Sequence, residues 1–467
     1  MQEQDYVALT ATEIAARVQS GELSAREAVS AALSRIEATE PKANAFIHLD
    51  KENALAEAER VDADRASGKD LGPLAGVPVS VKDLVHVAGM PTSSGSAVFA
   101  GKQAPEDAAP VARLRAADAV IVGKTTTPEF GHKPFTESPL FGRTLNPWNT
   151  DYTSGGSSGG AAVSVALRQV PLAIGTDGGG SVRIPASICG TYGLKATQGR
   201  IPHVHSADLF GNNSYIGPMT ANLEDLKLMY SVMAGPDSRD PWAKVLADAV
   251  VPPKPLRIGF ALKVGNPAIE EEVAVAVKKA AAELEQQGAE IETIDVNFAR
   301  YEPGFRVHLE SALMARVGSH LDSERERFDP SFVQTMENGR ARSGIDVQNA
   351  MSERTALYRE LERLFEKFDV LLTPTLAAAS LSADTDSHAD VEIAGVNAGA
   401  IRAGWYPYTF PMNLTGHPAI SVPCGWTSQG LPIGLQLAGR WYEEETLLNL
   451  ANDLHRGLGS FQRAASY

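Results

Sequence analysis

The segment GTDGGGSVRIPA, residues 175–186, follows a short apolar run and places consecutive glycines directly before Ser181. Residues without a Cβ atom adopt backbone conformations closed to other residues and let a ligand approach the main chain. We therefore expect the N–H groups of Gly178, Gly179 and Gly180 to converge on one anionic oxygen, as an oxyanion hole in which each donor contributes about 3 kcal/mol to a transition state. A serine at the end of this loop is placed to attack the carbonyl group that the loop binds.

A second serine-glycine run, GGSSGG at residues 155–160, lies upstream, and Lys82 follows the alternating valines of residues 76–81. Serine is a weak nucleophile, and a lysine can act as its base when burial disfavours the charged amine. The valines before Lys82 predict an interior position for its backbone. Ser157 is a candidate relay for the proton between Lys82 and Ser181, because a hydroxyl group both donates and accepts.

These segments resemble those of the amidase signature family of Ser-Ser-Lys hydrolases. The resemblance rests on residues 76–83, 155–162 and 175–186 in the family's order and spacing, and it continues into residues 413–423 and 430–437. It implies an α/β fold, with a large mixed central β-sheet covered by helices on both faces. It also implies Ser181 as the acyl-enzyme nucleophile, Ser157 as the bridging serine after a cis peptide bond, and Lys82 as the general base.

Three further residues are expected to support this site. Asp177 and Arg183 flank the glycine loop, and we expect them to orient it by hydrogen bonds rather than to take part in the chemistry. Ser158 precedes an Ala- and Val-rich helical segment, so we expect it to cap that helix.

Composition restricts the class of protein. Charged residues make up 21% and hydrophobic residues 43% of the 467, which is typical of a globular protein. The net charge of −15 argues against a broad nucleic-acid surface. No apolar run approaches the length of a membrane span, and the acidic N-terminus does not resemble a signal peptide. We therefore expect a cytoplasmic protein with no nucleic-acid or membrane partner.

The two cysteines, Cys189 and Cys424, are too far apart in sequence for a metal-ligand motif and too few for a disulfide framework. They indicate a reducing compartment and buried structural thiols. No cofactor or metal site is predicted.

The chain is predicted to form one domain, residues 1–467. Residues 1–70 are predicted to be helical, with capping boxes at Thr10–Glu13 and Ser24–Glu27. Residues 71–200 hold the catalytic motifs, and residues 377–400 are predicted to form a flexible surface loop. Alternating elements predict a layered α/β fold, with helices at 51–66, 107–117, 159–167, 270–287, 346–367 and 443–455, and strands at 76–81, 120–122, 172–174, 256–260, 291–294, 369–372, 419–422 and 433–437.

Other interpretations of these residues remain open. Glycine loops also bind phosphate, but neither run fits a P-loop or a dinucleotide motif. A Ser-His-Asp triad would need a histidine, and four lie nearby in sequence: His86, His132, His203 and His205. His203, His205 and Asp208 have the residue types of a metal site. Aromatic residues are candidates for an acyl pocket or for core packing (Phe130, with His132, Phe135 and Phe141), or for substrate gating (Trp405, Tyr406 and Tyr408).

The sequence thus predicts an amidase that hydrolyses the carboxamide C–N bond of a small molecule, or a related carbamate or ester. One alternative is the glutamine-hydrolysing subunit of a tRNA-dependent amidotransferase. Against it, Ile184 stands where those subunits usually have glutamine, and residues 301–349 lack their aromatic and basic pattern. Another alternative is a non-catalytic binding protein on the same scaffold. The oligomeric state, a homodimer included, and the natural substrate stay open.

Overall fold

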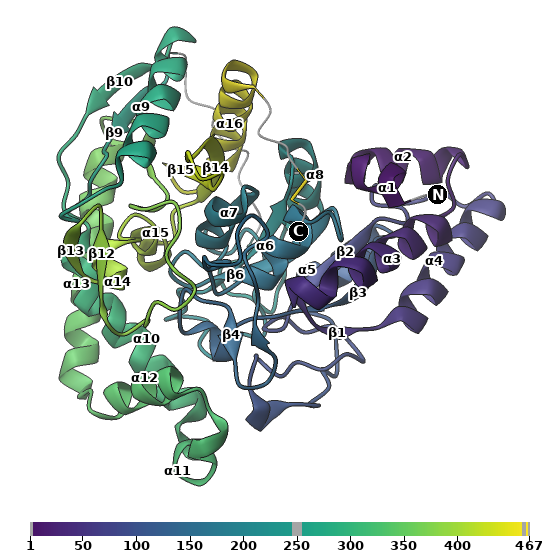
Figure 1. Ribbon diagram of the computed structural model, residues 1–467, viewed down its shortest axis with the longest axis horizontal. Coiled ribbons are helices and arrows are strands. Elements are labelled where there is room, and N and C mark those ends of the chain that lie inside the picture. The colour runs from purple at the N-terminus through teal and green to yellow at the C-terminus, as the bar shows by residue number, and fades with distance from the viewer. Residues whose placement is uncertain (1–2, 245–254, 460–463, 466–467) are drawn as a thin grey trace.

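The computed structural model describes residues 3–244, 255–459 and 464–465. Its centre is an eleven-stranded sheet in the order β1-β3-β2-β6-β8-β7-β14-β15-β11-β9-β10 (Figure 1). The strands of this sheet are β1 Phe46–Leu49, β2 Pro78–Lys82, β3 Val120–Thr125, β6 Leu172–Asp177, β7 Tyr192–Lys195, β8 Tyr215–Thr220, β9 Arg257–Phe260, β10 Glu290–Thr293, β11 Val370–Pro374, β14 Ala419–Trp426 and β15 Pro432–Gly439.

The sheet is mixed. Parallel pairs join β2 to β3 and β6, and β9 to β10 and β11, whereas antiparallel pairs form the middle, from β6 through β8, β7, β14 and β15 to β11. Two small antiparallel sheets lie outside it, formed by β4 Glu137–Ser138 with β5 Gly142–Arg143 and by β12 Asp390–Ile393 with β13 Val396–Ala400.

Helices surround the sheet. The N-terminal helices lie at the β1–β3 end and α9 to α13 at the opposite end (Figure 1). The α-helices are α1 Glu3–Ala8, α2 Ala11–Ser20, α3 Ala25–Ala43, α4 Lys51–Ala66, α5 Ala109–Ala116, α6 Gly159–Ala166, α7 Arg183–Cys189, α8 Leu223–Met233, α9 Glu271–Gln286, α10 Glu302–Val317, α11 Leu321–Glu324, α12 Pro330–Arg340, α13 Gly344–Phe365, α14 Ile401–Gly404, α15 Phe410–Thr415 and α16 Glu444–Leu458.

Strand β15 shows why both faces of the sheet are covered. Successive side chains of a strand point to opposite faces. Leu435 and Leu437 therefore lie in one apolar cluster, together with Leu447 of α16 and with residues of α9. Gln436, between them, points to the other face, where its Oε1 accepts a hydrogen bond from Arg183 of α7. The predicted α/β fold, with helices on both faces of a large mixed sheet, is confirmed.

The predicted strands and helices are all present, with ends within a few residues of the prediction. Both capping boxes are formed, by Thr10 with Glu13 and by Ser24 with Glu27. The prediction of an all-helical N-terminal segment was wrong at residues 46–49, which form the edge strand β1. This strand escaped prediction because it has only four residues between the ends of two helices.

The prediction of an irregular surface loop at residues 377–400 was wrong in two respects. Ala377 and Ala378 are buried, since their small side chains let the main chain pack inside the protein. Residues 390–400 form the β12–β13 hairpin, in which Ile393 pairs with Val396. The two turn residues have positive φ angles, 52° at Ala394 and 76° at Gly395, as a tight hairpin turn requires. The flexibility of this segment stays a prediction.

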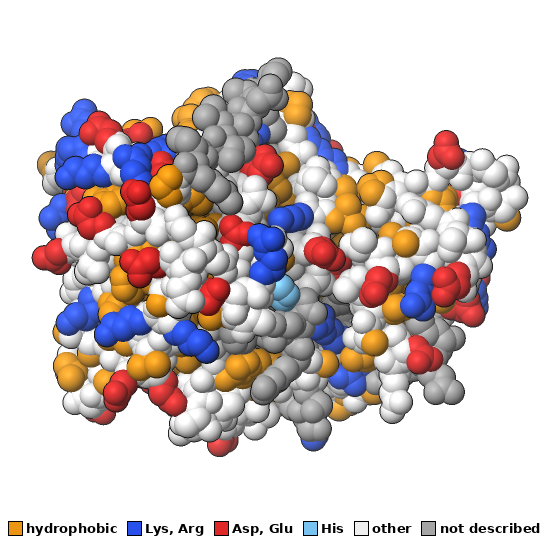
Figure 2. All heavy atoms as spheres, turned by 90° about the horizontal axis from the view of Figure 1, so that it is seen from above, with side chains coloured by type: hydrophobic (Ala, Val, Ile, Leu, Met, Phe, Trp, Pro, Cys, Tyr) orange, Lys and Arg blue, Asp and Glu red, His pale blue; other side chains and the backbone are white. Residues whose placement is uncertain are grey.

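Acidic and basic side chains are interspersed over the face shown in Figure 2. Such mixing favours solubility and offers no broad surface of one charge on that face. In the described part of the chain, no helix is long and apolar enough to cross a membrane.

Candidate active site

The parallel pairing of β2 with β6 brings the two most informative sequence motifs together. Val81 is in register with Ile174, and the carboxyl ends of parallel strands lie at the same edge of a sheet. Lys82 ends β2 at this edge, while Thr176 and Asp177 end β6 and lead into the glycine loop. The site is therefore built where two adjacent strands end.

Lys82 is fully buried and bound only by neutral oxygen atoms. Its Nζ lies 2.7 Å from Ser157 Oγ, 2.9 Å from Ser158 Oγ and 2.9 Å from Thr176 Oγ1, with the Thr176 carbonyl at 3.4 Å. Burial lowers the pKa of Lys82 well below its ordinary value, and the charge of Asp177 opposes this only in part. The surroundings therefore favour the neutral amine.

The first serine-glycine run contacts the end of β2 through the hydrogen bonds of Ser157 and Ser158 with Lys82. Its Gly156–Ser157 peptide bond is cis, as the family resemblance implies, and Ser157 is buried beside Lys82. Gly131 packs on the other side of Ser157, with a φ angle of 71°, and a Cβ atom placed on it would lie 2.9 Å from Ser157 Oγ. A side chain at position 131 would therefore crowd the Ser157 hydroxyl.

The prediction that Ser158 caps α6 was wrong. Ser158 occupies the N-cap position, but its side chain makes no cap hydrogen bond. The hydroxyl group instead donates to the Thr176 carbonyl at 3.0 Å and accepts from Thr176 N and Lys82 Nζ. The main-chain N–H of Ser158 donates to the carbonyl of Ser181 at 3.1 Å, which connects the two serine loops.

Asp177 and Arg183 hold the glycine loop from inside. They form a fully buried ion pair, with Arg183 Nη2 2.9 Å from Asp177 Oδ1 and Nε 3.0 Å from Oδ2. The carboxylate also accepts from Gly180 N and Val182 N. Burial alone would raise the pKa of Asp177, but the charge and hydrogen bonds of Arg183, with a further bond from Asn413, hold it well below its ordinary value. These hydrogen bonds fit the expected role of the pair in orienting the loop, which stays a prediction.

The remaining arginine donors reach residues that the sequence analysis did not single out. Arg183 Nη1 donates to the Thr409 carbonyl and to Gln436 Oε1, and Nη2 donates to Asn413 Oδ1. Thr409 Oγ1 donates to the Gly179 carbonyl at 2.7 Å. Asn413 and Gln436 fall in the C-terminal segments that resemble the family, which was the available signal, but spacing alone does not place them at the glycine loop.

One predicted oxyanion donor is not available. The N–H of Gly180 donates to Asp177 Oδ1 at 2.6 Å, so the expected role of Gly180 in the oxyanion hole is not supported. The N–H groups of Gly178, Gly179 and Ser181 have no acceptor within the described part of the chain. Gly178 and Ser181 are half-exposed, and the Ser181 hydroxyl makes no hydrogen bond to described residues. The half-exposed end of the loop therefore combines a hydroxyl with unpaired N–H groups.

The histidines considered above are held elsewhere. His132 contacts the Glu129 carbonyl and Ser331, His203 contacts the Ser214 carbonyl, and His205 contacts Glu106. The rings of His86 and His205 lie 4.4 Å apart. Among the described residues, no group of three potential ligands could hold a metal ion.

Other candidates belong to the protein interior. Trp405 and Tyr408 are buried and donate to the carbonyls of Ala378 and Leu262, which does not favour gating. Phe130 stacks on Phe332 of α12, with ring centroids 5.2 Å apart. Cys189 and Cys424 are buried free thiols, and burial raises the pKa of both.

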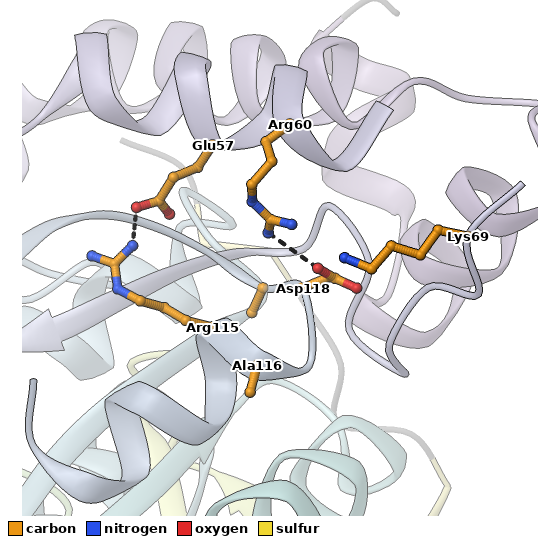
Figure 3. Close-up of a pocket in the computed structure, with 7 residues that line it drawn as sticks. Glu57, Arg60, Lys69, Arg115, Ala116 and Asp118 are labelled. Atoms are coloured by element: carbon orange, nitrogen blue, oxygen red, sulfur yellow. Dashed lines mark hydrogen bonds and ion pairs between the residues drawn. The ribbon is translucent and has the colours of Figure 1, made fainter. Parts of the chain in front are cut away.

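A separate surface pocket of about 400 Å³ lies between α4, α5 and the loop after α4 (Figure 3). Its charged side chains pair with one another or with neighbours, as in the ion pairs Arg115–Glu57 and Arg60–Asp118. None of the serines discussed above lines it, nor does Lys82. This pocket is therefore distinct from the candidate active site.

A buried lysine, a cis-linked serine and a serine-bearing glycine loop lie at one sheet edge, as the resemblance to the amidase signature family implies. The profile of the family described as Amidase matches residues 27–448, and the chain belongs to this family, whose enzymes hydrolyse amides.

Two curated relatives are almost equally similar. An acylamidase from Rhodococcus erythropolis is 36% identical, over 97% of this chain and 96% of its own length. A subunit of the glutamyl-tRNA(Gln) amidotransferase from Synechococcus sp. (strain CC9605) is 35% identical, over 95% of each chain.

Solved structures agree on the fold. A bacterial aryl acylamidase of the amidase signature family superposes with a TM-score of 0.89 at 27% identity, covering 96% of both chains. A 6-aminohexanoate cyclic dimer hydrolase superposes with a TM-score of 0.86 at 29% identity, covering 98% of this chain and 99% of its own.

Proposed function

We propose that this chain is a stand-alone amidase that hydrolyses the C–N bond of a small carboxamide through an acyl-enzyme at Ser181. The observation that carries the proposal is the 2.7 Å contact between Ser157 Oγ and the amine of Lys82, which is buried without a carboxylate ligand. A neutral lysine is a base strong enough to accept the proton of a serine through a relay.

The hydrogen bonds around Lys82 support a direction for the relay. A neutral amine has two N–H donors and one lone pair. Because Ser158 gives its proton to the Thr176 carbonyl, it can only accept from Lys82. With the second N–H directed to Thr176, the lone pair is left for the hydroxyl proton of Ser157. Ser157 would then accept the proton of Ser181 once substrate binding brings the two hydroxyl groups within hydrogen-bond distance, because catalytic hydrogen bonds tighten when the substrate is bound.

The reaction would proceed in two halves. Ser181 Oγ attacks the carbonyl carbon while its proton passes to Ser157 and the Ser157 proton passes to Lys82, which becomes an ammonium. The N–H groups of Gly178 and Gly179 would bind the oxyanion. Return of the proton through Ser157 to the leaving nitrogen breaks the C–N bond, and water then hydrolyses the acyl-enzyme by the same relay. Carbamates and esters present the same carbonyl group to this site.

The test is turnover of simple amides by the purified single chain and by its Ser181→Ala variant. We expect the wild type to release amine from aryl or alkyl amides, and the variant to lose at least about a thousandfold in kcat. Labelling of the wild type by a serine-reactive phosphonate should disappear in the same variant. Near-normal turnover by Ser181→Ala would refute the assignment.

The likeness to the amidotransferase relative supports a second candidate, a glutaminase that works only in a complex. Activity of the isolated chain on simple amides would exclude a strict requirement for partner subunits. A chain that is inactive alone but hydrolyses glutamine when partner subunits are added would favour this candidate. A wild-type chain that Ser181-directed probes fail to label would instead favour a non-catalytic binding protein.

A further inference from the structure

Helix α10 contacts the glycine loop near its N-terminal end and extends away from the loop. A Cβ atom placed on Gly179 would lie 2.6 Å from Phe305 Cζ, so the Phe305 ring of α10 packs directly on the loop. Arg316 follows eleven residues later in the same helix. At 3.6 residues per turn, this spacing returns Arg316 to the face of Phe305, roughly 16 Å farther along the helix axis. Half-exposed Leu309 lies between them, near the same face.

The guanidinium group of Arg316 is fixed beside the segment that contacts Ser157. It lies over the Phe130 ring, 5.2 Å from the ring centroid. Phe130 directly precedes Gly131, the residue that packs against Ser157 Oγ. Phe130 and Leu309 both pack against the apolar cluster of α10 and α12. The cation is thus held on the same side of the molecule as the candidate relay.

Arg316 has no acidic partner in the described part of the chain, although the residue is exposed. The acidic residues of α10 are engaged elsewhere: Glu302 with Arg306, and Glu310 with Arg306 and Arg342. The titratable groups near its guanidinium include the imidazoles of His86 and His203. Among the residues that the structure describes, no neighbour therefore neutralises the charge that Arg316 presents.

We propose that Arg316 binds a carboxylate on the substrate, on the order of 10 Å from the scissile carbonyl. Both side chains lean toward the helix N-terminus alike, so this distance is the helical rise of roughly 16 Å from Phe305 to Arg316 less the length of the contact between guanidinium and carboxylate. A planar guanidinium binds a carboxylate through two parallel hydrogen bonds, and its stacking on Phe130 preorganises it for that geometry. The proposal rests on the proposed amide hydrolysis and narrows it to anionic amides.

The test compares amides that differ only in the remote charge. One pair of series carries the charge on the acyl side: ω-carboxyalkanoyl 4-nitroanilides from butanoyl to decanoyl, and uncharged alkanoyl 4-nitroanilides of equal length. A second pair places the carboxylate on the amine side, as N-acyl ω-amino acids and the matching N-acyl alkylamines. Kinetic constants are measured for the wild type, Arg316→Gln, Arg316→Lys and a control, Arg325→Gln. The control removes the same charge from an exposed pair with Glu337.

We expect Arg316→Gln to lower kcat/KM for the carboxylate series by roughly 10- to 100-fold, mainly through KM. Uncharged amides should change less than about twofold, Arg316→Lys should be intermediate, and Arg325→Gln should match the wild type. Equal effects of Arg316→Gln on charged and uncharged amides in both pairs of series would overturn the proposal. So would a wild type with no preference for a carboxylate.

A failure of the proposed amide hydrolysis would give a different result from a failure of the Arg316 proposal. If the wild type cleaves neither charged nor uncharged amides, amide hydrolysis by the isolated chain is refuted. Calorimetry with Ser181→Ala then still tests Arg316. Carboxylate binding that disappears when Arg316→Gln is added supports the site, and absent or Arg316-independent binding overturns it.

Discussion

The buried pair of Asp177 and Arg183 gives the sharpest test of how the glycine loop is held. In Asp177→Asn the size of the side chain is kept and only its charge and acceptors change. Oδ1 accepts from Gly180 N, Arg183 Nη2 and Asn413 Nδ2, and Oδ2 accepts from Val182 N and from Arg183 N and Nε. Whichever oxygen becomes an amide nitrogen, three buried donors then face a donor.

Each buried donor without an acceptor costs about 1–3 kcal/mol, and breaking a buried ion pair typically costs about 3–5 kcal/mol. We therefore expect Asp177→Asn to lower the free energy of unfolding by about 3–5 kcal/mol, measured by denaturant titration. The matched control is Asp384→Asn, which removes an exposed pair with Arg143 and should cost less than about 1 kcal/mol. If the two variants were equally stable, the loop would not depend on this pair.

The pH dependence of Asp177→Asn distinguishes a misplaced glycine loop from a loss of the proposed base. The charge of Asp177 raises the pKa of Lys82, against the larger effect of burial. Removing that charge should lower the pKa of Lys82 further, so the acid limb of the kcat/KM profile should move to lower pH while kcat falls. An acid limb that moves to higher pH would contradict this assignment of charges.

Two further predictions concern Lys82 and Ser158. Lys82→Met should abolish amide hydrolysis yet raise the free energy of unfolding at neutral pH, because a lysine that is neutral when folded and protonated when unfolded costs about 1.4 kcal/mol for each unit by which the pH lies below its unfolded pKa. In the wild type, kcat/KM should fall in acid as Lys82 becomes protonated, and a pH-independent kcat/KM would contradict a neutral base. The cost of burying Lys82 should shrink, and the free energy of unfolding rise, as the pH increases from the folded pKa of the lysine toward its unfolded pKa. Ser158→Ala should reduce kcat by about 10- to 100-fold with little change in KM, because it removes one acceptor that orients the Lys82 amine. An unchanged kcat would show that Ser158 has only a structural role.

Sequence patterns predicted those parts of the site that depend on local chemistry. The valines before Lys82 indicated its burial, and the glycines before Ser181 indicated an accessible main chain. The cis bond before Ser157 came only from the family resemblance. Gly180 was misassigned because its N–H bonds Asp177 three residues earlier, and that carboxylate is held in place by Arg183.

The parts that could not be predicted depend on long-range packing. Asn413 and Gln436 reach Arg183 across more than 200 residues of sequence, because β15 and α15 pack against α7. Helices α10 and α12 carry no motif, so neither Phe305 over Gly179 nor Arg316 over Phe130 had a local signal. The proposed substrate contact of Arg316 comes from such a segment, which is why the family's reaction was predictable and the substrate was not.

The opposite charge states of Lys82 and Asp177 have a common origin. Both are fully buried at the end of neighbouring strands, yet Asp177 is charged and the surroundings of Lys82 favour the neutral form. The difference is Arg183, which places its charge against the carboxylate at 2.9 Å, while Lys82 has only hydroxyl and carbonyl oxygens within hydrogen-bond distance. Without Arg183, the Asp177 charge would have, among the described residues, only the buried lysines Lys195 and Lys82 to offset it, and a Lys82 protonated for that purpose would lose its lone pair. The guanidinium therefore does more than hold the loop: by offsetting the charge of Asp177, it leaves Lys82 free to act as the proposed base.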